Sequence, residues 1–132
     1  LGKASLFSFP FGRIMRALGG ISVDRSKPNG MVEQVVNTIC SIPKISLVIP
    51  PSGTRHKTEY WKSGFYHIAK TANVSIVCGY LDYDKKRAGL GPNFFVSDST
   101  SDDMDKIREF YKDKVGKFPA LTSSIRLKEE QH

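Results

Sequence analysis

The chain has 132 residues, of which 39% are hydrophobic and 25% charged, and its formal net charge at pH 7 is +7. That length suits one domain with a core of its own, and no apolar run approaches the ~20 residues that a helix needs to span a bilayer. The excess of basic residues favours an anionic partner, whether nucleic acid, an anionic lipid headgroup or a phosphorylated metabolite.

The first half of the chain is predicted to alternate helices and strands. A helix over residues 11–18 ends at Gly19-Gly20, and a short strand follows over residues 21–23. The next helix has apolar residues at the spacing of one buried face and ends at Pro43. That face consists of Val32, Val35, Val36, Ile39 and Cys40. The β-branched run at residues 45–49 predicts a buried strand.

The second half continues the alternation. A helix is predicted over residues 62–71, a strand over 74–80, a basic loop over 82–91 and a brief strand over 94–96. The last helix is predicted to begin near Asp102 and to stop at Gly116. Its buried residues are expected to be Met104, Ile107, Phe110 and Tyr111. We therefore expect one domain over residues 1–116, followed by a surface arm over residues 117–132.

The two cysteines, Cys40 and Cys78, lie inside apolar runs, so both are expected to be reduced residues of the core. No histidine is close to a cysteine in sequence, and no metal-binding spacing is present. We therefore predict no metal ligand.

This order of elements indicates an α/β fold with a largely parallel twisted sheet flanked by helices. Ligands of such sheets bind beyond the carboxyl ends of the strands. Two turns with an arginine follow predicted strands, and both could therefore reach one site.

The first turn, Pro50 to Arg55, presents hydroxyls, backbone N–H groups and a guanidinium together, a combination that suits a phosphate. We expect Ser52, Gly53, Thr54 and Arg55 to bind that phosphate. The other turn lies upstream, at residues 19–25, and contributes Arg25, with Gly20 as a supporting residue. Lys62 is a further candidate that could add positive charge to the site. The alternatives are ordinary turn chemistry for residues 52–54, surface ion pairs for the two arginines and a solvated lysine at position 62.

Three blocks of the sequence resemble those of the glycerolipid acyltransferases, the lysophosphatidic acid (1-acylglycerol-3-phosphate) acyltransferase family. They are Gly19-Gly20-Ile21-Ser22-Val23-Asp24-Arg25, Pro51-Ser52-Gly53-Thr54-Arg55 and Val74-Ser75-Ile76-Val77. The segments at residues 61–66 and 79–83 resemble a bacterial branch of that family. The resemblance covers roughly residues 1–119 and depends on the order and spacing of the blocks.

The resemblance implies an enzyme of phospholipid synthesis with the glycerol-3-phosphate acyltransferase-like fold. Such enzymes transfer a fatty acyl group from acyl-CoA or acyl carrier protein to a hydroxyl of a glycerophosphate or lysophospholipid, without a cofactor. A His-x-x-x-x-Asp block supplies their general base. No histidine of this chain has an aspartate five residues later, so we expect that block upstream of Leu1 and predict no catalytic residue within the chain.

Two further departures concern the matched blocks, because Ser52 stands where the family has Glu and Ser75 where it has Pro. They leave open a non-catalytic module that binds a lipid phosphate or a partner and retains the fold. A nucleic-acid-binding domain is suggested by charge alone, so we expect no nucleic-acid partner. The expected location is the cytoplasm, with peripheral contact to the inner face of the membrane as an open alternative.

Overall fold

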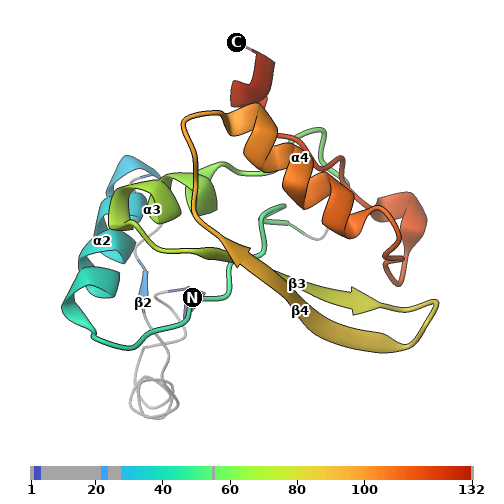
Figure 1. The fold of residues 1–132 in the computed structure, drawn as a ribbon, viewed down its shortest axis with the longest axis horizontal. Helices are drawn as coiled ribbons and strands as arrows, with labels where there is room; N and C mark the ends of the chain where they lie inside the picture. The colour runs from blue at the N-terminus through green and yellow to red at the C-terminus, as the bar shows by residue number, and fades with distance from the viewer. Residues whose placement is uncertain (1, 4–21, 24–27, 55, 132) are drawn as a thin grey trace. The chain divides into compact units, whose positions relative to one another are not determined.

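The computed structural model describes residues 2–3, 22–23, 28–54 and 56–131 (Figure 1). Contacts divide the chain into two units, Leu1–Ile49 and Pro50–His132. The division at residue 116 that the sequence favours stays a prediction. None of the helices in the described ranges is both long and apolar enough to cross a bilayer.

The described residues of the first unit form one helix and a minimal strand pairing. Strand β1 (Gly2–Lys3) pairs in parallel with β2 (Ser22–Val23), and helix α2 spans Pro28–Ser41. The predicted helix before Pro43 is thus confirmed, and Val35 at its centre is buried. The predicted helix over residues 11–18 lies outside the described residues.

Two predictions for the first unit are wrong. Cys40 is exposed, because it lies in the last turn of α2, beyond the buried Val35. The run at residues 45–49 forms no strand, and Val48 in it is 83% exposed. Flanking prolines at positions 43, 50 and 51 have no N–H to give to a sheet, and a β-branched run needs a neighbouring strand to pair with.

The predicted parallel sheet is also wrong. In the second unit, β3 (Ile76–Asp82) and β4 (Arg87–Phe94) form a two-stranded antiparallel hairpin. The chain reverses within four residues, too few for the crossover that a parallel pair requires. The Asp82 carboxylate accepts the N–H groups of Asp84 (3.1 Å) and Lys85 (3.2 Å), and Lys86 takes a left-handed conformation with φ of 51°. Residues 87–91, which the sequence suggested were loop, therefore belong to a strand.

The other two helices of the prediction are confirmed, with shifted ends. Helix α3 spans Gly64–Ala72 and ends at Asn73, whose φ is 52°. Helix α4 spans Thr100–Tyr111 and is capped by the Ser99 hydroxyl, which accepts the N–H of Asp102. It ends before the predicted stop at Gly116.

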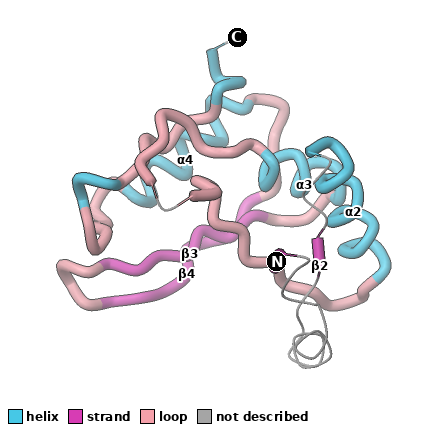
Figure 2. Tube along the Cα trace, turned by 180° about the vertical axis from the view of Figure 1, so that it is seen from behind, coloured by secondary structure: helices cyan, strands magenta, loops and turns pink. Residues whose placement is uncertain are grey.

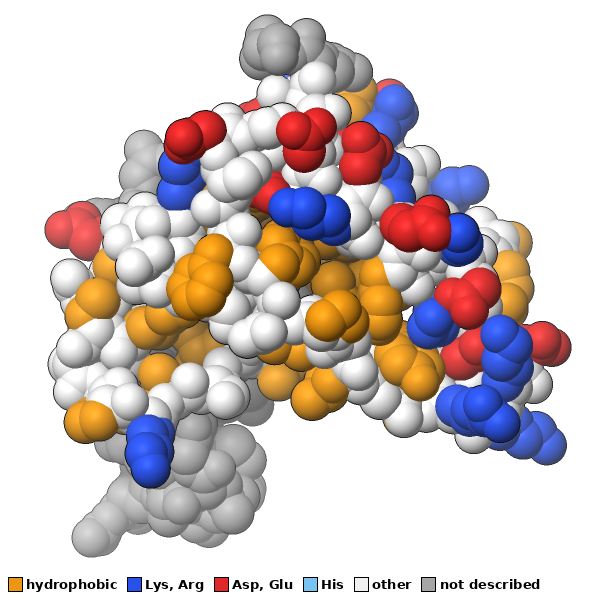
Figure 3. Space-filling model, viewed as in Figure 1, with side chains coloured by type: hydrophobic (Ala, Val, Ile, Leu, Met, Phe, Trp, Pro, Cys, Tyr) orange, Lys and Arg blue, Asp and Glu red, His pale blue; other side chains and the backbone are white. Residues whose placement is uncertain are grey.

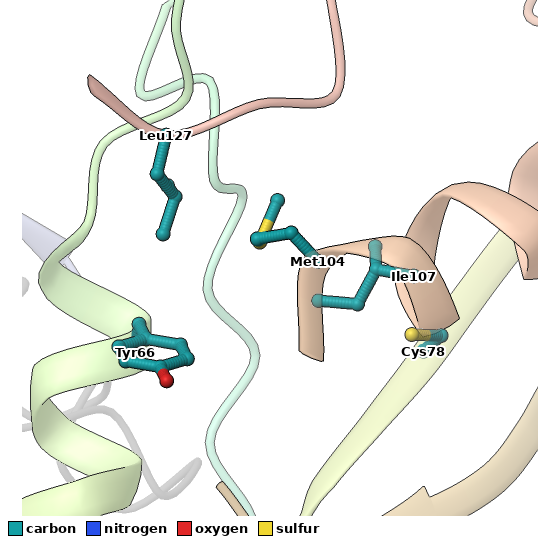
Figure 4. Close-up of a cluster of buried hydrophobic side chains, with 5 residues drawn as sticks. All are labelled: Tyr66, Cys78, Met104, Ile107 and Leu127. Atoms are coloured by element: carbon teal, nitrogen blue, oxygen red, sulfur yellow. The ribbon is translucent and has the colours of Figure 1, made fainter. Parts of the chain in front are cut away.

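The core of the second unit gathers side chains from α3, β3, α4 and the C-terminal segment. Figure 4 shows its buried members, which are Tyr66, Cys78, Met104, Ile107 and Leu127. Cys78 is thus buried as predicted. The prediction of a surface arm after residue 116 is wrong at Leu127, which is 1% exposed.

The C-terminal segment turns back after α4 and runs along the helix to its own short 3-10 helix, η3 (Lys128–Gln131), as Figures 1 and 2 show. Arg108 of α4 holds it, donating to the Ile125 carbonyl (3.1 Å) and to Glu130 (2.7 Å). On the other side, the Trp61 N–H donates to the Arg126 carbonyl at 2.8 Å. The segment thus joins α4 to the loop that precedes α3.

A buried carboxylate organises the start of α4. Asp103 is fully buried and accepts from the Tyr66 hydroxyl (3.1 Å), the Ser97 N–H (2.7 Å) and the Lys106 ammonium (3.1 Å). Burial raises the pKa of Asp103, but these hydrogen bonds outweigh it, so the pKa lies below its usual value. The carboxylate is therefore held ionised at neutral pH.

Candidate functional site

The Pro50 turn is a hydrogen-bonded β-turn. The Gly53 N–H donates to the Pro50 carbonyl at 3.1 Å, and Pro51 occupies the second position, where its fixed φ suits a turn. The Lys62 N–H donates to the Pro51 carbonyl at 2.8 Å. The turn is thus anchored to the residues just before α3.

The hydroxyls of this turn have different capacities. The Ser52 hydroxyl donates to the Thr54 carbonyl (3.1 Å), which occupies its single proton. The Thr54 hydroxyl accepts the N–H of His56 (3.2 Å) and keeps its own proton available for a ligand. Thr54, and not Ser52, is therefore the hydroxyl donor that an anion at this turn would meet.

Gly53 and Lys62 lie against each other. Gly53 has a φ of +66°, in the left-handed region, and a Cβ placed there would be 3.2 Å from Cγ of Lys62. The stem of Lys62 thus crosses the turn, while its ammonium has no carboxylate partner within residues 28–54 and 56–131. Ser52, Gly53, Thr54 and Lys62 are therefore brought together, and Lys62 is exposed, as the alternative of a solvated lysine expects.

The three remaining candidates, Gly20, Arg25 and Arg55, lie outside the described residues. Convergence of the two arginines on one phosphate therefore stays a prediction.

A cavity of about 340 Å³ opens beside the turn. Pro51, Ser52, Thr54 and His56 line it on the side of the turn. Its other lining residues are largely apolar or aromatic and include Trp61, Tyr80, Leu81, Tyr111, Leu121 and Ile125. An apolar space that adjoins the Thr54 hydroxyl suits an amphiphile with an anionic head.

The sequence prediction missed this aromatic lining. Trp61 contacts Tyr111 edge-to-face, with ring centroids 6.2 Å apart. The signal in the sequence was weak, since Tyr111 lies in the apolar stripe of α4 and Trp61 only borders a predicted helix. Their proximity depends on the C-terminal segment that joins the two elements.

Tyr111, which lines the cavity, and its neighbour Cys78 are not poised as bases or nucleophiles. Burial and the neighbouring Cys78 raise the pKa of Tyr111 to about 12, and its hydroxyl donates to the Gly79 carbonyl at 2.6 Å. Burial also raises the pKa of Cys78, although a hydrogen bond with Tyr111 acts against it. Both groups are therefore neutral at pH 7. His56 is exposed and has no carboxylate partner in the described ranges.

Within the described part of the chain, no group of three or more His, Cys, Asp or Glu side chains could hold a metal ion. Among the described residues of the turn, the Thr54 hydroxyl and the exposed Lys62 side chain are the groups that an anion could meet. Comparisons of this chain with known protein families, with curated proteins and with solved structures found no match.

Proposed function

We propose that this chain is the acceptor-binding part of a phospholipid-synthesis acyltransferase. In this role the Pro50 turn binds the phosphate of a glycerophosphate or lysophospholipid, whose hydroxyl receives a fatty acyl group from acyl-CoA or acyl carrier protein. The observation that carries the proposal is the contact of Lys62 with the Gly53 turn, beside the available hydroxyl of Thr54. It supports a phosphate site at the block that resembles the family's phosphate-binding block.

The cavity beside the turn supports the same substrate class. A lysophospholipid has a phosphate, a glycerol hydroxyl and an apolar tail, and the cavity adjoins Thr54 while Trp61 and Leu121 line its apolar part. The phosphate would be held by charge-assisted hydrogen bonds, and the tail would leave water by contact with those side chains.

Acyl transfer also needs a base to take the proton of the attacking hydroxyl. The 132 residues contain no His-x-x-x-x-Asp, and loss of a general base costs ~10²–10⁴ in rate. We therefore expect these residues to bind the acceptor without appreciable turnover. The proposal requires a His-x-x-x-x-Asp encoded upstream of Leu1 in the same frame, and sequencing of that region tests it. If that reading frame lacks the His-x-x-x-x-Asp pair, the remaining candidate is a non-catalytic module that binds a phosphate, a function that needs no general base.

Binding is tested with lysophosphatidic acid and with the monoacylglycerol that lacks only the phosphate. Trp61 is the single tryptophan and lines the cavity, so its fluorescence reports occupancy. We expect saturable binding of the phosphorylated lipid and at least tenfold weaker binding of the other, since a hydrogen bond to a charged group contributes ~1.5–3 kcal/mol.

Lys62→Ala and Arg55→Ala should each weaken lysophosphatidic acid binding by ~1.5–3 kcal/mol. Lys128→Ala, at an exposed lysine of η3, is the matched control and should leave the affinity unchanged. Equal affinity for the two lipids, or for Lys62→Ala and the unaltered chain, contradicts a phosphate site at this turn.

A further inference from the structure

The hairpin turn, residues 83–87, and the segment after α4, residues 112–121, form one end of the second unit. We call this end the basic tip. The Tyr83 N–H donates to the Val115 carbonyl at 2.8 Å, and the Lys85 ammonium lies 3.7 Å from the Asp113 carboxylate. Figure 1 shows both segments at the same end of the hairpin. Two stretches that are some 30 residues apart in sequence thus share one surface.

Positive charge dominates the basic tip. Figure 3 shows lysine and arginine side chains gathered where the hairpin turn lies. Lys85 and Lys114 are paired with carboxylates, and Lys112 pairs with Glu109. Lys86, Arg87 and Lys117, in contrast, have no carboxylate partner in the part of the chain that the structure describes.

Apolar side chains lie among these cations and face solvent. Phe118 is 61% exposed, Leu121 54% and Tyr83 50%. The Lys117 ammonium lies 5.4 Å from the centre of the Phe118 ring. Exposed apolar groups close to unpaired cations mark an interaction surface, since each apolar group costs free energy while it stays in water.

We propose that the basic tip docks on a bilayer containing anionic lipids. Lys86, Arg87 and Lys117 would lie at the phosphate level, where each basic residue strengthens binding, and Phe118, Leu121 and Tyr83 would enter the interface beneath the headgroups. Nucleic acid would satisfy the same cations but offers the phenylalanine and leucine at the tip no apolar environment along its phosphate backbone.

Docking at this tip also places the candidate cavity near the membrane. Leu121 belongs to the tip and lines the cavity together with Leu81 of β3. A docked chain would therefore present the cavity to lipid. The inference does not rest on acyl transfer, because it follows from surface charge and exposure alone.

The test is flotation of the full 132-residue chain with vesicles of phosphatidylcholine alone or of phosphatidylcholine mixed with phosphatidylglycerol. We expect binding to the anionic vesicles only, and weaker binding as salt is raised. Lys86→Glu should lower partitioning roughly ten- to thirtyfold, because it removes one cation and adds an anion. Phe118→Ser should lower it several-fold.

Matched controls distinguish the contribution of the basic tip to vesicle binding from the effects of net charge and overall hydrophobicity. Lys128→Glu makes the same charge change in η3, and Phe95→Ser removes a phenylalanine of similar exposure, 59%, at the opposite end of β4. Both should bind like the unaltered chain. Circular dichroism checks that each variant is folded, and Lys117→Glu replaces Lys86→Glu if that variant fails.

Three results overturn the proposal. They are no binding of the unaltered chain to anionic vesicles, equal losses in Lys128→Glu and Lys86→Glu, and retention of an oligonucleotide that anionic vesicles do not displace. The last result would assign the tip to nucleic acid.

Discussion

Replacing Gly53 with alanine tests the geometry on which the candidate site depends. The φ of +66° places residue 53 in the left-handed region, where a residue with a Cβ costs ~1–2 kcal/mol. The added Cβ would also lie 3.2 Å from Cγ of Lys62, a tight contact that the flexible lysine stem can relieve by moving away. We therefore expect Gly53→Ala to lower the free energy of unfolding by ~1–2 kcal/mol, almost all of it from the backbone.

The displacement of Lys62 has a separate consequence. If its stem leaves the turn, Lys62 moves away from the proposed phosphate site, so Gly53→Ala should weaken lysophosphatidic acid binding about as much as Lys62→Ala does. Urea unfolding measures the stability, and Trp61 fluorescence measures the affinity. Gly53→Asn is the control for the backbone, because asparagine tolerates the left-handed region better than alanine and should lose less stability.

A double-mutant cycle separates the two effects. With Lys62→Ala in place, the crowding is gone but the backbone cost remains, so Gly53→Ala should still destabilise the chain by ~1–2 kcal/mol. A stability loss below ~0.5 kcal/mol for Gly53→Ala would refute the left-handed turn, since ordinary surface substitutions fall in that range. Equal losses for alanine and asparagine would place the cost in the contact with Lys62 instead.

Three other substitutions test the core and its ionisable groups. Leu127→Ala should lower the free energy of unfolding by ~2–5 kcal/mol in urea titrations, because the side chain is 1% exposed, and a loss under ~1 kcal/mol would contradict its burial. Asp103 has a lowered pKa in the folded state, so it stabilises the chain above its unfolded pKa of ~3.9 and loses this contribution as pH falls through the folded value. Asp103→Asn should therefore be less stable at pH 7 and lose less stability on acidification, and unchanged acid dependence of the urea midpoint would contradict the network. Tyr111 has its pKa raised from 10.0 to about 12, so stability should fall as pH rises between these values. Phenolate absorbance should show a titration step at high pH that the Tyr111→Phe variant lacks. If the variant still shows that step, the step belongs to another tyrosine.

The helices could be predicted from the sequence because their signals are local. Each helix carries its apolar face within its own segment, as regular apolar spacing in α2 and α4 and as small residues in α3. This face can be recognised without knowing what it packs against. The ends were less accurate, as at α4, which stops at Tyr111 and not at Gly116.

The hairpin could not be predicted because its turn has an unusual composition. The sequence lacks the two-residue Asn-Gly type of turn that marks a hairpin, because four residues join these strands. The Asp82 carboxylate organises this longer turn, and Lys86 takes the left-handed position. Gly89 and Gly91, which suggest a loop in the sequence, lie in β4. A Cβ at Gly91 would be 2.5 Å from the Phe110 ring, so the glycine is needed for the close approach of α4 to the strand.

At the candidate site the turn could be predicted, whereas its role in binding stays a prediction. Its turn follows from the Pro-Pro-Ser-Gly sequence, but the contact between Gly53 and Lys62 depends on the bond from Lys62 to Pro51. The aromatic lining could not be predicted, since Trp61 and Tyr111 are 50 residues apart in sequence and meet only through tertiary packing.

The burial of Leu127 bears on how the protein is made. A ribosome releases the chain from its N-terminus onward, so α3, the hairpin and α4 all emerge before this residue does. During that interval Tyr66, Met104 and Ile107 lack one neighbour of their final cluster. The second unit therefore completes its folding only after synthesis has passed Leu127, and pausing of translation in the preceding codons would prolong exposure of an unfinished core to chaperones and proteases.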